Sequence, residues 1–207
     1  MKFYNILFGL LILTLNGCGD AVTSSTNDKS STINLSNLNG TWIQECQFDA
    51  SDSTSYKESY VFSSSTYTAT NSVTYYSDSA CSTQSFSINF KIYNMYLGAK
   101  STTTNDIIIN RFFATLSDLT IKPLSSTVAS ALNSIAYCGI TSWVSDIESS
   151  IAGLTCSSST MVAANSSFIN IVQMNSEMTY IRFGNFSEVD SDGYPTTLYS
   201  NLYYKYN

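Results

Sequence analysis

The chain has 207 residues, enough for one sizeable domain or two small ones, and its 43% hydrophobic and 14% aromatic content excludes wholesale disorder. Fifteen acidic residues and nine basic ones give a net charge of −6, so the chain lacks the excess positive charge that nucleic-acid binding needs. The chain contains no histidine, so histidine-based triads, general bases and metal ligands are all excluded.

The first residues carry the pattern of an export signal. A positive charge on Lys2 precedes an almost wholly apolar run over residues 6–15. This run is too short to cross a bilayer and is typical of a secretory signal peptide, which we assign to residues 1–17. The segment Leu15–Cys18 resembles a bacterial lipobox, in which the cysteine is diacylated and becomes the new N-terminus, although Asn16 is unusual at its second position.

Acylation of Cys18 therefore predicts a palmitate-bearing lipoprotein anchored to a membrane without a transmembrane helix. It also leaves four of the five cysteines for pairing. Gly19, rather than aspartate, follows Cys18, and resemblance to sorting in enteric bacteria then implies the outer membrane of a diderm bacterium. The alternative is an ordinary signal peptide followed by a free cysteine. Residues 18–36 are small and polar and predict a flexible tether, with one domain over residues 37–207.

Alternation of apolar and polar residues dominates that domain. Within residues 86–92 every second side chain is apolar, as in a strand with one buried face. Further strands are predicted at residues 41–48, 56–63, 67–75, 106–114, 118–122, 167–174, 178–184 and 198–206, with a hairpin turn at 175–177. Eight or nine short strands favour a closed barrel or a sandwich, and a closed antiparallel barrel leaves no free edge.

One short helix is predicted over residues 126–137, where apolar residues recur at helical spacing. Ser125 or Ser126 can cap its start and Gly139 can end it, while Pro123 separates it from the preceding strand. The predicted fold is therefore all-β, an antiparallel barrel with one short helix.

Four cysteines remain after Cys18, and in an exported protein disulfides are the default. Three connectivities are possible, and we favour the two sequence-local pairs. Each pair would be worth about 3 kcal/mol in the chain-entropy model. A zinc site is the rival interpretation, but neither a C-x-x-C spacing nor a histidine supports it. The favoured pairs are Cys46–Cys81 and Cys138–Cys156.

The start of the first strand carries a family resemblance. Gly40 and Trp42 form a G-x-W motif that resembles the signature of lipocalins and the wider calycins. The resemblance implies that Trp42 plugs the closed end of a lipocalin-like barrel and that Arg182 lies over its ring. Further stretches within residues 131–156 and 183–206 resemble lipocalin-like bacterial lipoproteins of no settled activity. The T-D-Y loop signature is absent, so the resemblance does not imply a ligand carrier.

Glu188, Asp190 and Asp192 stand at alternate positions ahead of Gly193, as in the first half of a calcium loop. The twelfth position of such a loop would need a glutamate, and the chain has Tyr199 there. A weak calcium site is therefore one interpretation of this segment, and a turn before the last strand is the other. No metal ligand set is assigned with certainty.

The sequence contains few residue patterns that indicate catalysis. Serine is abundant, but no histidine, S-x-x-K or G-x-S-x-G motif could activate it. A carboxylate pair for glycoside chemistry could come from several glutamates, and the sequence does not select two of them. We expect no enzyme activity and no cofactor. The candidates are Glu45, Glu58, Glu177 and Glu188.

The aromatic content bears on two binding functions. Eleven phenylalanines and fifteen tyrosines can fill a barrel, which favours a protein that acts through its outer surface on another protein or a glycan, or as an inhibitor. The pairs Tyr75–Tyr76 and Tyr203–Tyr204 could serve such a surface or the core. The alternative is a carrier of a small hydrophobic ligand or lipid, with residues 67–75 and 86–92 lining the lumen.

Overall fold

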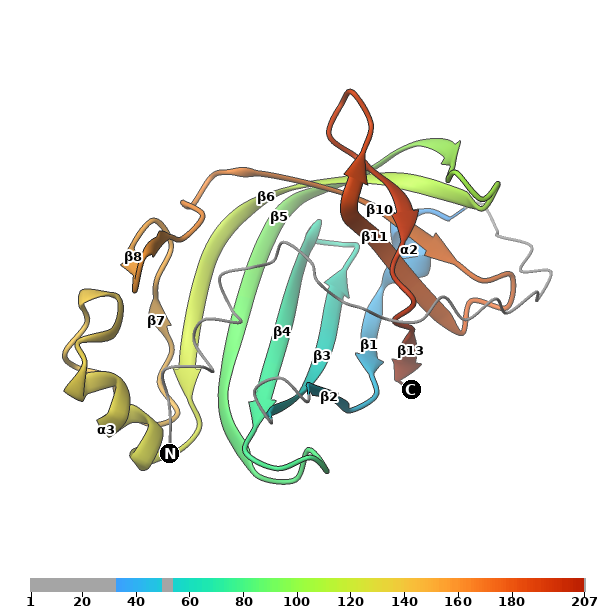
Figure 1. Ribbon diagram of the computed structural model, residues 1–207. Coiled ribbons are helices and arrows are strands. Elements are labelled where there is room, and N and C mark those ends of the chain that lie inside the picture. Colours follow the sequence, from blue (N-terminus) through green and yellow to red (C-terminus); the bar gives the residue numbers. More distant parts are fainter. Residues whose placement is uncertain (1–32, 50–53, 207) are drawn as a thin grey trace.

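Inward and outward side chains alternate along eight strands that close into a barrel in the computed structural model, which describes residues 33–49 and 54–206 (Figure 1). All neighbouring pairs are antiparallel, and β1 pairs with both β3 and β13, so the barrel has no free edge in its wall. This confirms the predicted fold class. The strands are β1 (Gly40–Gln44), β3 (Thr54–Ser63), β4 (Thr68–Tyr76), β5 (Gln84–Thr102), β6 (Ile108–Pro123), β10 (Ser167–Met174), β11 (Tyr180–Val189) and β13 (Tyr203–Tyr206).

Shorter elements extend or cover the barrel. Strand β2 (Gln47–Asp49) pairs with β3, β7 (Ser149–Ser150) with β6, and β12 (Pro195–Leu198) with β11. The hairpin of β11 and β12 projects from one end of the barrel (Figure 1). Strands β8 (Thr155–Cys156) and β9 (Ser159–Thr160) form a separate two-stranded sheet.

Strand lengths differ from the sequence prediction. The predicted strands 106–114 and 118–122 are one continuous strand, β6, and β5 runs well beyond residues 86–92. Register shifts between β5 and β6 bend this long pair, which hides its continuity from a pattern of strict alternation. The predicted strand 198–206 is instead divided between β12 and β13.

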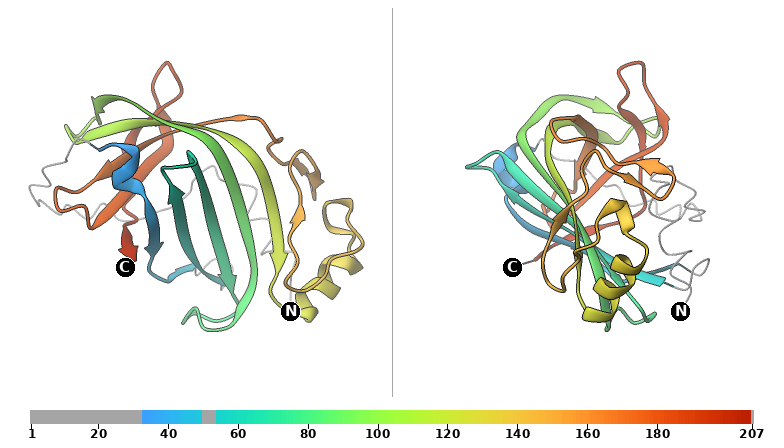
Figure 2. Two further views of the ribbon diagram at one scale, coloured as in Figure 1. Left: turned by 180° about the vertical axis from the view of Figure 1, so that it is seen from behind. Right: turned by 90° about the vertical axis from the view of Figure 1, so that its left-hand side faces the viewer.

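The predicted helix is present but shorter. Helix α3 (Ser126–Ser134) starts where the Ser125 hydroxyl accepts the Val128 N–H at 3.2 Å. The left-handed backbone of Ala136 then separates it from the short 3-10 helix η1 (Tyr137–Gly139), within which Cys138 is also left-handed. The whole insertion between β6 and β10 lies at one side of the barrel, beside β6 (Figures 1 and 2).

Both favoured disulfides are confirmed. Cys46–Cys81 joins the segment after β1 to the loop between β4 and β5, across 35 residues of sequence. Cys138–Cys156 joins η1 to β8 inside the insertion, across 18 residues. One disulfide therefore cross-links the barrel, and the other cross-links the insertion between β6 and β10.

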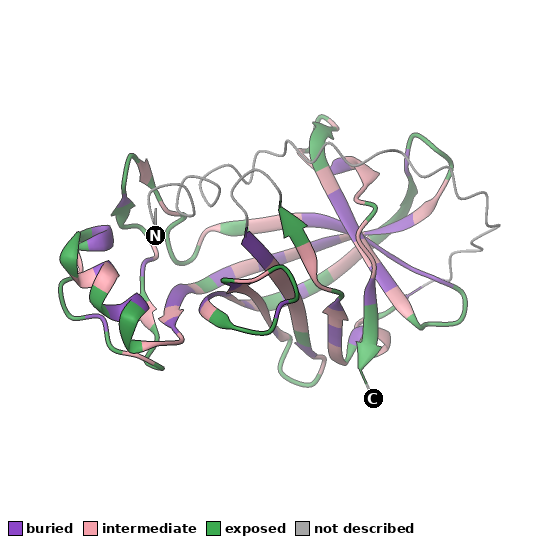
Figure 3. Cartoon of the chain, turned by 60° about the horizontal axis from the view of Figure 1, so that its bottom comes forward, coloured by how far each residue is buried: buried purple, intermediate pink, exposed green. Residues whose placement is uncertain are grey.

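The core begins before residue 37. Ile33 is buried, and helix α2 (Leu35–Leu38) places Leu38 in the core, so the last residues of the predicted tether belong to the fold. Trp42 is fully buried on the inner face of β1, and its indole N–H donates to the Leu38 carbonyl at 2.6 Å. Buried positions recur along the barrel strands in Figure 3.

The export signal and Cys18 lie outside the described residues. Among the residues that the structure does describe, no helix is both long and apolar enough to span a membrane.

Candidate functional site

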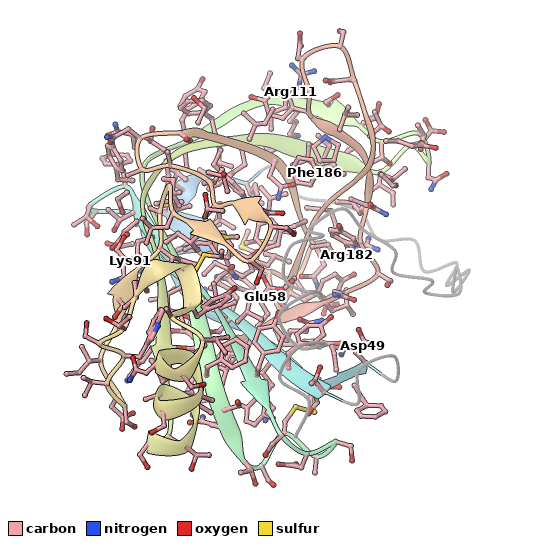
Figure 4. All side chains as sticks on the ribbon, turned by 60° about the vertical axis from the view of Figure 1, so that its left-hand side comes forward. Asp49, Glu58, Lys91, Arg111, Arg182 and Phe186 are labelled. Atoms are coloured by element: carbon pink, nitrogen blue, oxygen red, sulfur yellow. A yellow bond between two sulfur atoms is a disulfide. The ribbon has the colours of Figure 1, made fainter. Side chains whose placement is uncertain are left out.

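Two regions of the barrel gather polar and aromatic side chains, one inside and one outside. The inner region centres on Glu58. Glu45, Glu177 and Glu188 are exposed, whereas Glu58 lies on the inward face of β3 and near the centre of the molecule in Figure 4. The outer region is an aromatic part of the wall around β1 and β13.

The interior is packed by a chain of aromatic contacts. Tyr60 lies 4.5 Å from Phe183 and 5.1 Å from Tyr203 between ring centroids, and it stacks on Phe62. Phe62 in turn meets Phe112 edge to face. These rings come from β3, β6, β11 and β13, so they contact one another across the interior of the barrel.

Glu58 is held within this aromatic interior by two hydrogen bonds. Tyr203 donates its hydroxyl to Glu58 Oε2 at 2.5 Å, and Asn71 Nδ2 donates to Oε1 at 2.7 Å. The strand register explains why Asn71 reaches Glu58. Asn71 lies opposite Tyr60, two residues from Glu58, and the inward residues of β3 and β4 share one face. Glu58 itself is half-buried, whereas Tyr203 is buried.

Four tyrosines near this carboxylate have raised pKa values. Burial raises the pKa of Tyr56, Tyr60 and Tyr199, and the negative charge of Glu58 raises each further. Burial also raises the pKa of Tyr203, followed by the effects of Tyr60 and Glu58. These phenols therefore remain neutral at physiological pH and can act as hydrogen-bond donors.

The outer region, here called the tyrosine face, lies on four adjacent strands. Thr41 pairs with Val61 on one side and Tyr206 on the other, and Tyr204 pairs with both Ile43 and Tyr180. Their neighbours Trp42 and Tyr203 point inward, so these side chains point outward. Exposure reaches 50% for Val61, 44% for Tyr204 and 69% for Tyr206. The tyrosine face consists of Ile43, Val61, Tyr180, Tyr204 and Tyr206.

A lysine, not the arginine that the resemblance implied, lies over the core tryptophan. Lys205 Nζ is 5.3 Å from the centre of the Trp42 ring. Arg182 stands between the buried residues Ile181 and Phe183, so alternation directs it outward, where its Nε donates to Gln173 Oε1 at 2.8 Å. The cation over Trp42 therefore comes from the last strand, opposite Trp42 in the register.

The suggested calcium loop forms a turn closed by an arginine. Arg111 pairs with Asp190 at 2.6 Å and Asp192 at 2.8 Å, and its guanidinium lies 4.4 Å from the Tyr194 ring centre. The hydrogen bond to Asp192 raises the pKa of Arg111, which stays charged. Asp190 also accepts two backbone N–H groups of the turn, while Glu188 is exposed. In the described ranges, no group of three or more candidate ligands could hold a metal ion.

The importance of Glu58 was missed at the sequence level, although a signal was present. Tyr56, Glu58, Tyr60 and Phe62 alternate along one strand, so the apolar inward face of β3 is interrupted by a carboxylate. A charged residue in phase with core aromatics marks a buried polar site.

The sequence matches no protein-family model and no curated protein. The class of protein is therefore defined by its architecture. It is a closed, eight-stranded antiparallel barrel, consistent with a lipocalin-like fold.

Proposed function

We propose that this protein is a lipid-anchored envelope protein that binds a protein or glycan partner through the outer surface of its barrel, without catalysis. The observation that carries the proposal is the tyrosine face. Three of its side chains, Val61, Tyr204 and Tyr206, are each more than 40% exposed and sit on a wall of regular, paired strands.

Exposed tyrosines suit recognition because each offers a large rigid ring and a hydroxyl that can donate or accept a hydrogen bond. Such rings lose little conformational entropy on binding, and tyrosine is enriched among residues that dominate interface energies. The strands hold the rings at fixed spacings. A preformed surface of this kind needs no rearrangement to meet a partner.

Anchoring is proposed on the sequence alone. The apolar run, the lipobox-like segment and Cys18 support attachment by an N-terminal lipid, and the outer membrane of a diderm bacterium is the proposed location. The barrel would then stand at the membrane surface with its walls available to partners.

The alternative, a carrier of a hydrophobic ligand or lipid in the lumen, receives less support. Aromatic rings from opposite walls contact one another across the barrel, and the inward carboxylate of Glu58 would have to lose water against an apolar ligand.

A photo-crosslinking experiment in the native envelope tests the surface proposal. A photoreactive phenylalanine analogue is placed at Tyr206 in one strain and, as a matched control, at Val162 in another, because Val162 is also exposed but lies on the insertion. The proposal predicts one discrete crosslinked partner from position 206, lost when Tyr204 is also changed to Ala. Equal crosslinking from both positions, or none from position 206, would contradict it.

A further inference from the structure

Glu58 is hydrogen-bonded, but it forms none of the ion pairs found among residues 33–49 and 54–206. In the described part of the chain, no lysine or arginine lies within ion-pair distance of its carboxylate, and the ion pairs there involve other carboxylates. Its oxygens accept hydrogen bonds from Tyr203 and Asn71, and Tyr60 is a further hydrogen-bonding neighbour. A carboxylate has about four acceptor positions, so at least one is left for another donor. A negative charge held in a largely aromatic interior is costly unless a positive group accompanies it.

The side chains around Glu58 are suited to a positive group. Tyr60 and Tyr203 meet at right angles beside the carboxylate, and Tyr56 and Tyr199 are close enough for its charge to raise the pKa of each. All four rings are neutral, and the faces of such rings attract cations. Tyr56, Glu58, Tyr60 and Tyr199 are only half-buried, so part of the cluster is accessible to solvent.

A second observation, a buried amide without hydrogen-bond partners, lies at the same place. Gln44 is only 1% exposed, yet neither its Nε2 nor its Oε1 has a hydrogen-bond partner. It lies on the inner face of β1 opposite Tyr203, one residue beyond the pair Ile43–Ser59 and thus beside Glu58 in the ladder. A buried amide without partners is destabilising, and a bound group with hydrogen-bonding atoms would relieve that cost.

We propose that Glu58, Gln44 and the tyrosines around them form a binding site for a small organic cation, specifically a protonated amine. The ammonium group donates to the carboxylate of Glu58 and to Oε1 of Gln44, and the rings of Tyr60 and Tyr203 flank its alkyl part. This site is inside the barrel, so it is separate from the tyrosine face and does not depend on the proposed surface function.

The test is isothermal titration calorimetry on the full chain in the form its host produces, with butylammonium at neutral pH. Butanol and butyrate, which have similar size but no positive charge, are the comparison ligands. The proposal predicts binding of butylammonium alone, weakened about tenfold or more by Glu58→Gln, because a charge-assisted hydrogen bond is lost. Glu148→Gln, which removes a carboxylate paired with Lys91 on the outside, is the matched control and should bind as the unchanged chain does.

Three results would overturn the proposal. They are no heat of binding with millimolar butylammonium, butanol binding as tightly as butylammonium, and undiminished binding in Glu58→Gln. If Glu58→Gln does not fold, the comparison of the three ligands on the unchanged chain still decides. None of these results bears on the crosslinking from Tyr206, so the two proposals fail separately.

Discussion

Trp42 is one of the largest fully buried residues of the barrel core. It is fully buried, its indole bonds Leu38, and Lys205 lies over its ring. Trp42→Ala should lower the free energy of unfolding by about 3–5 kcal/mol, because it removes a large core side chain and leaves a cavity. Urea denaturation measures the change. Val162→Ala, at an exposed position, is the control, and a loss below about 1 kcal/mol for Trp42→Ala would show that the ring is not part of the core.

Asp78 gives the protein a defined sensitivity to acid. Its carboxylate accepts backbone N–H groups from Ser82, Thr83 and Ala80, and the bonds from Ser82 and Thr83 lower its pKa from 3.8 to about 2. Because the folded pKa lies below the unfolded one, the stabilisation is complete above about pH 4 and is lost as the pH falls through about 2.

Substituting Asp78 tests this dependence. Thermal midpoints of Asp78→Asn measured from pH 7 to pH 2 should fall less steeply below pH 4 than those of the unchanged chain, because the variant has no carboxylate to protonate. Asp106→Asn, in an exposed hairpin loop, is the matched control. Identical profiles for Asp78→Asn and the unchanged chain would exclude this role for Asp78.

Single residues were predicted unevenly from the sequence. The resemblance of Gly40 and Trp42 to the lipocalin signature predicted that Trp42 lies inside the barrel, and its burial in the core confirms this. The partner of its ring was assigned to Arg182, because a resemblance carries no information about phase within a late strand. The register shows Lys205 in that position. Glu58 was one of four unplaced glutamates until the strands brought Tyr203 and Asn71 to it.

Among the elements, the close packing of β12 against β11 depends on Gly184 of β11. A Cβ at Gly184 would lie 2.5 Å from Pro195 Cβ and 2.6 Å from Ile171 Cγ1, well inside the ordinary contact distance between carbons. Gly184→Ala should destabilise the protein by about 1–3 kcal/mol as β12 is pushed from β11. Gly98→Ala is the control, because its nearest neighbour lies at 3.4 Å. Equal unfolding free energies for the two variants would refute this packing argument.

The two disulfides should contribute different amounts to the free energy of unfolding, because they close loops of different length. Replacing Cys138 and Cys156 by Ala should cost about 3 kcal/mol, and replacing Cys46 and Cys81 should cost about 0.6 kcal/mol more, since the sequence separation doubles from 18 to 35. Denaturant unfolding of both double variants measures the difference. The reverse order would mean that native-state packing, not chain entropy, sets their value.

Elements with clean alternation were predicted well, and bent ones were not. Residues 86–92 and 167–174 fall inside observed strands, and the turn at residues 175–177 is present, with the Asn175 side chain accepting two backbone N–H groups. The continuity of β6 was missed because register shifts place polar residues where strict alternation expects apolar ones.

At the scale of the whole molecule, attachment to the membrane remains a prediction from the sequence. Cys18→Ser should release the protein into the soluble fraction without changing its unfolding curve, because the lipid rather than the barrel supplies membrane affinity. Fractionation followed by a salt wash measures the release, and Cys18→Ser protein that stays with the membrane would contradict lipid anchoring.

The barrel could be predicted as a whole because strand number, cysteine pairing and alternation all agree on one closed architecture. The candidate sites could not, because each is assembled across strands far apart in sequence. Glu58 and Tyr203 are separated by 145 residues, and the tyrosine face draws on β1, β3, β11 and β13. Only register decides which side chains share a face, and one residue of slip exchanges inside and outside.

The closure of β1 on β13 also sets the order in which the protein can mature. Thr41 pairs with Tyr206, so the seam of the barrel joins its first strand to its last. A ribosome makes the N-terminal strand first and the C-terminal strand last. Until β13 is complete, β1 keeps one unpaired edge and Trp42 lacks the strand that carries Lys205. Disruption of β13 alone, a strand of 4 residues, would therefore leave the barrel wall open.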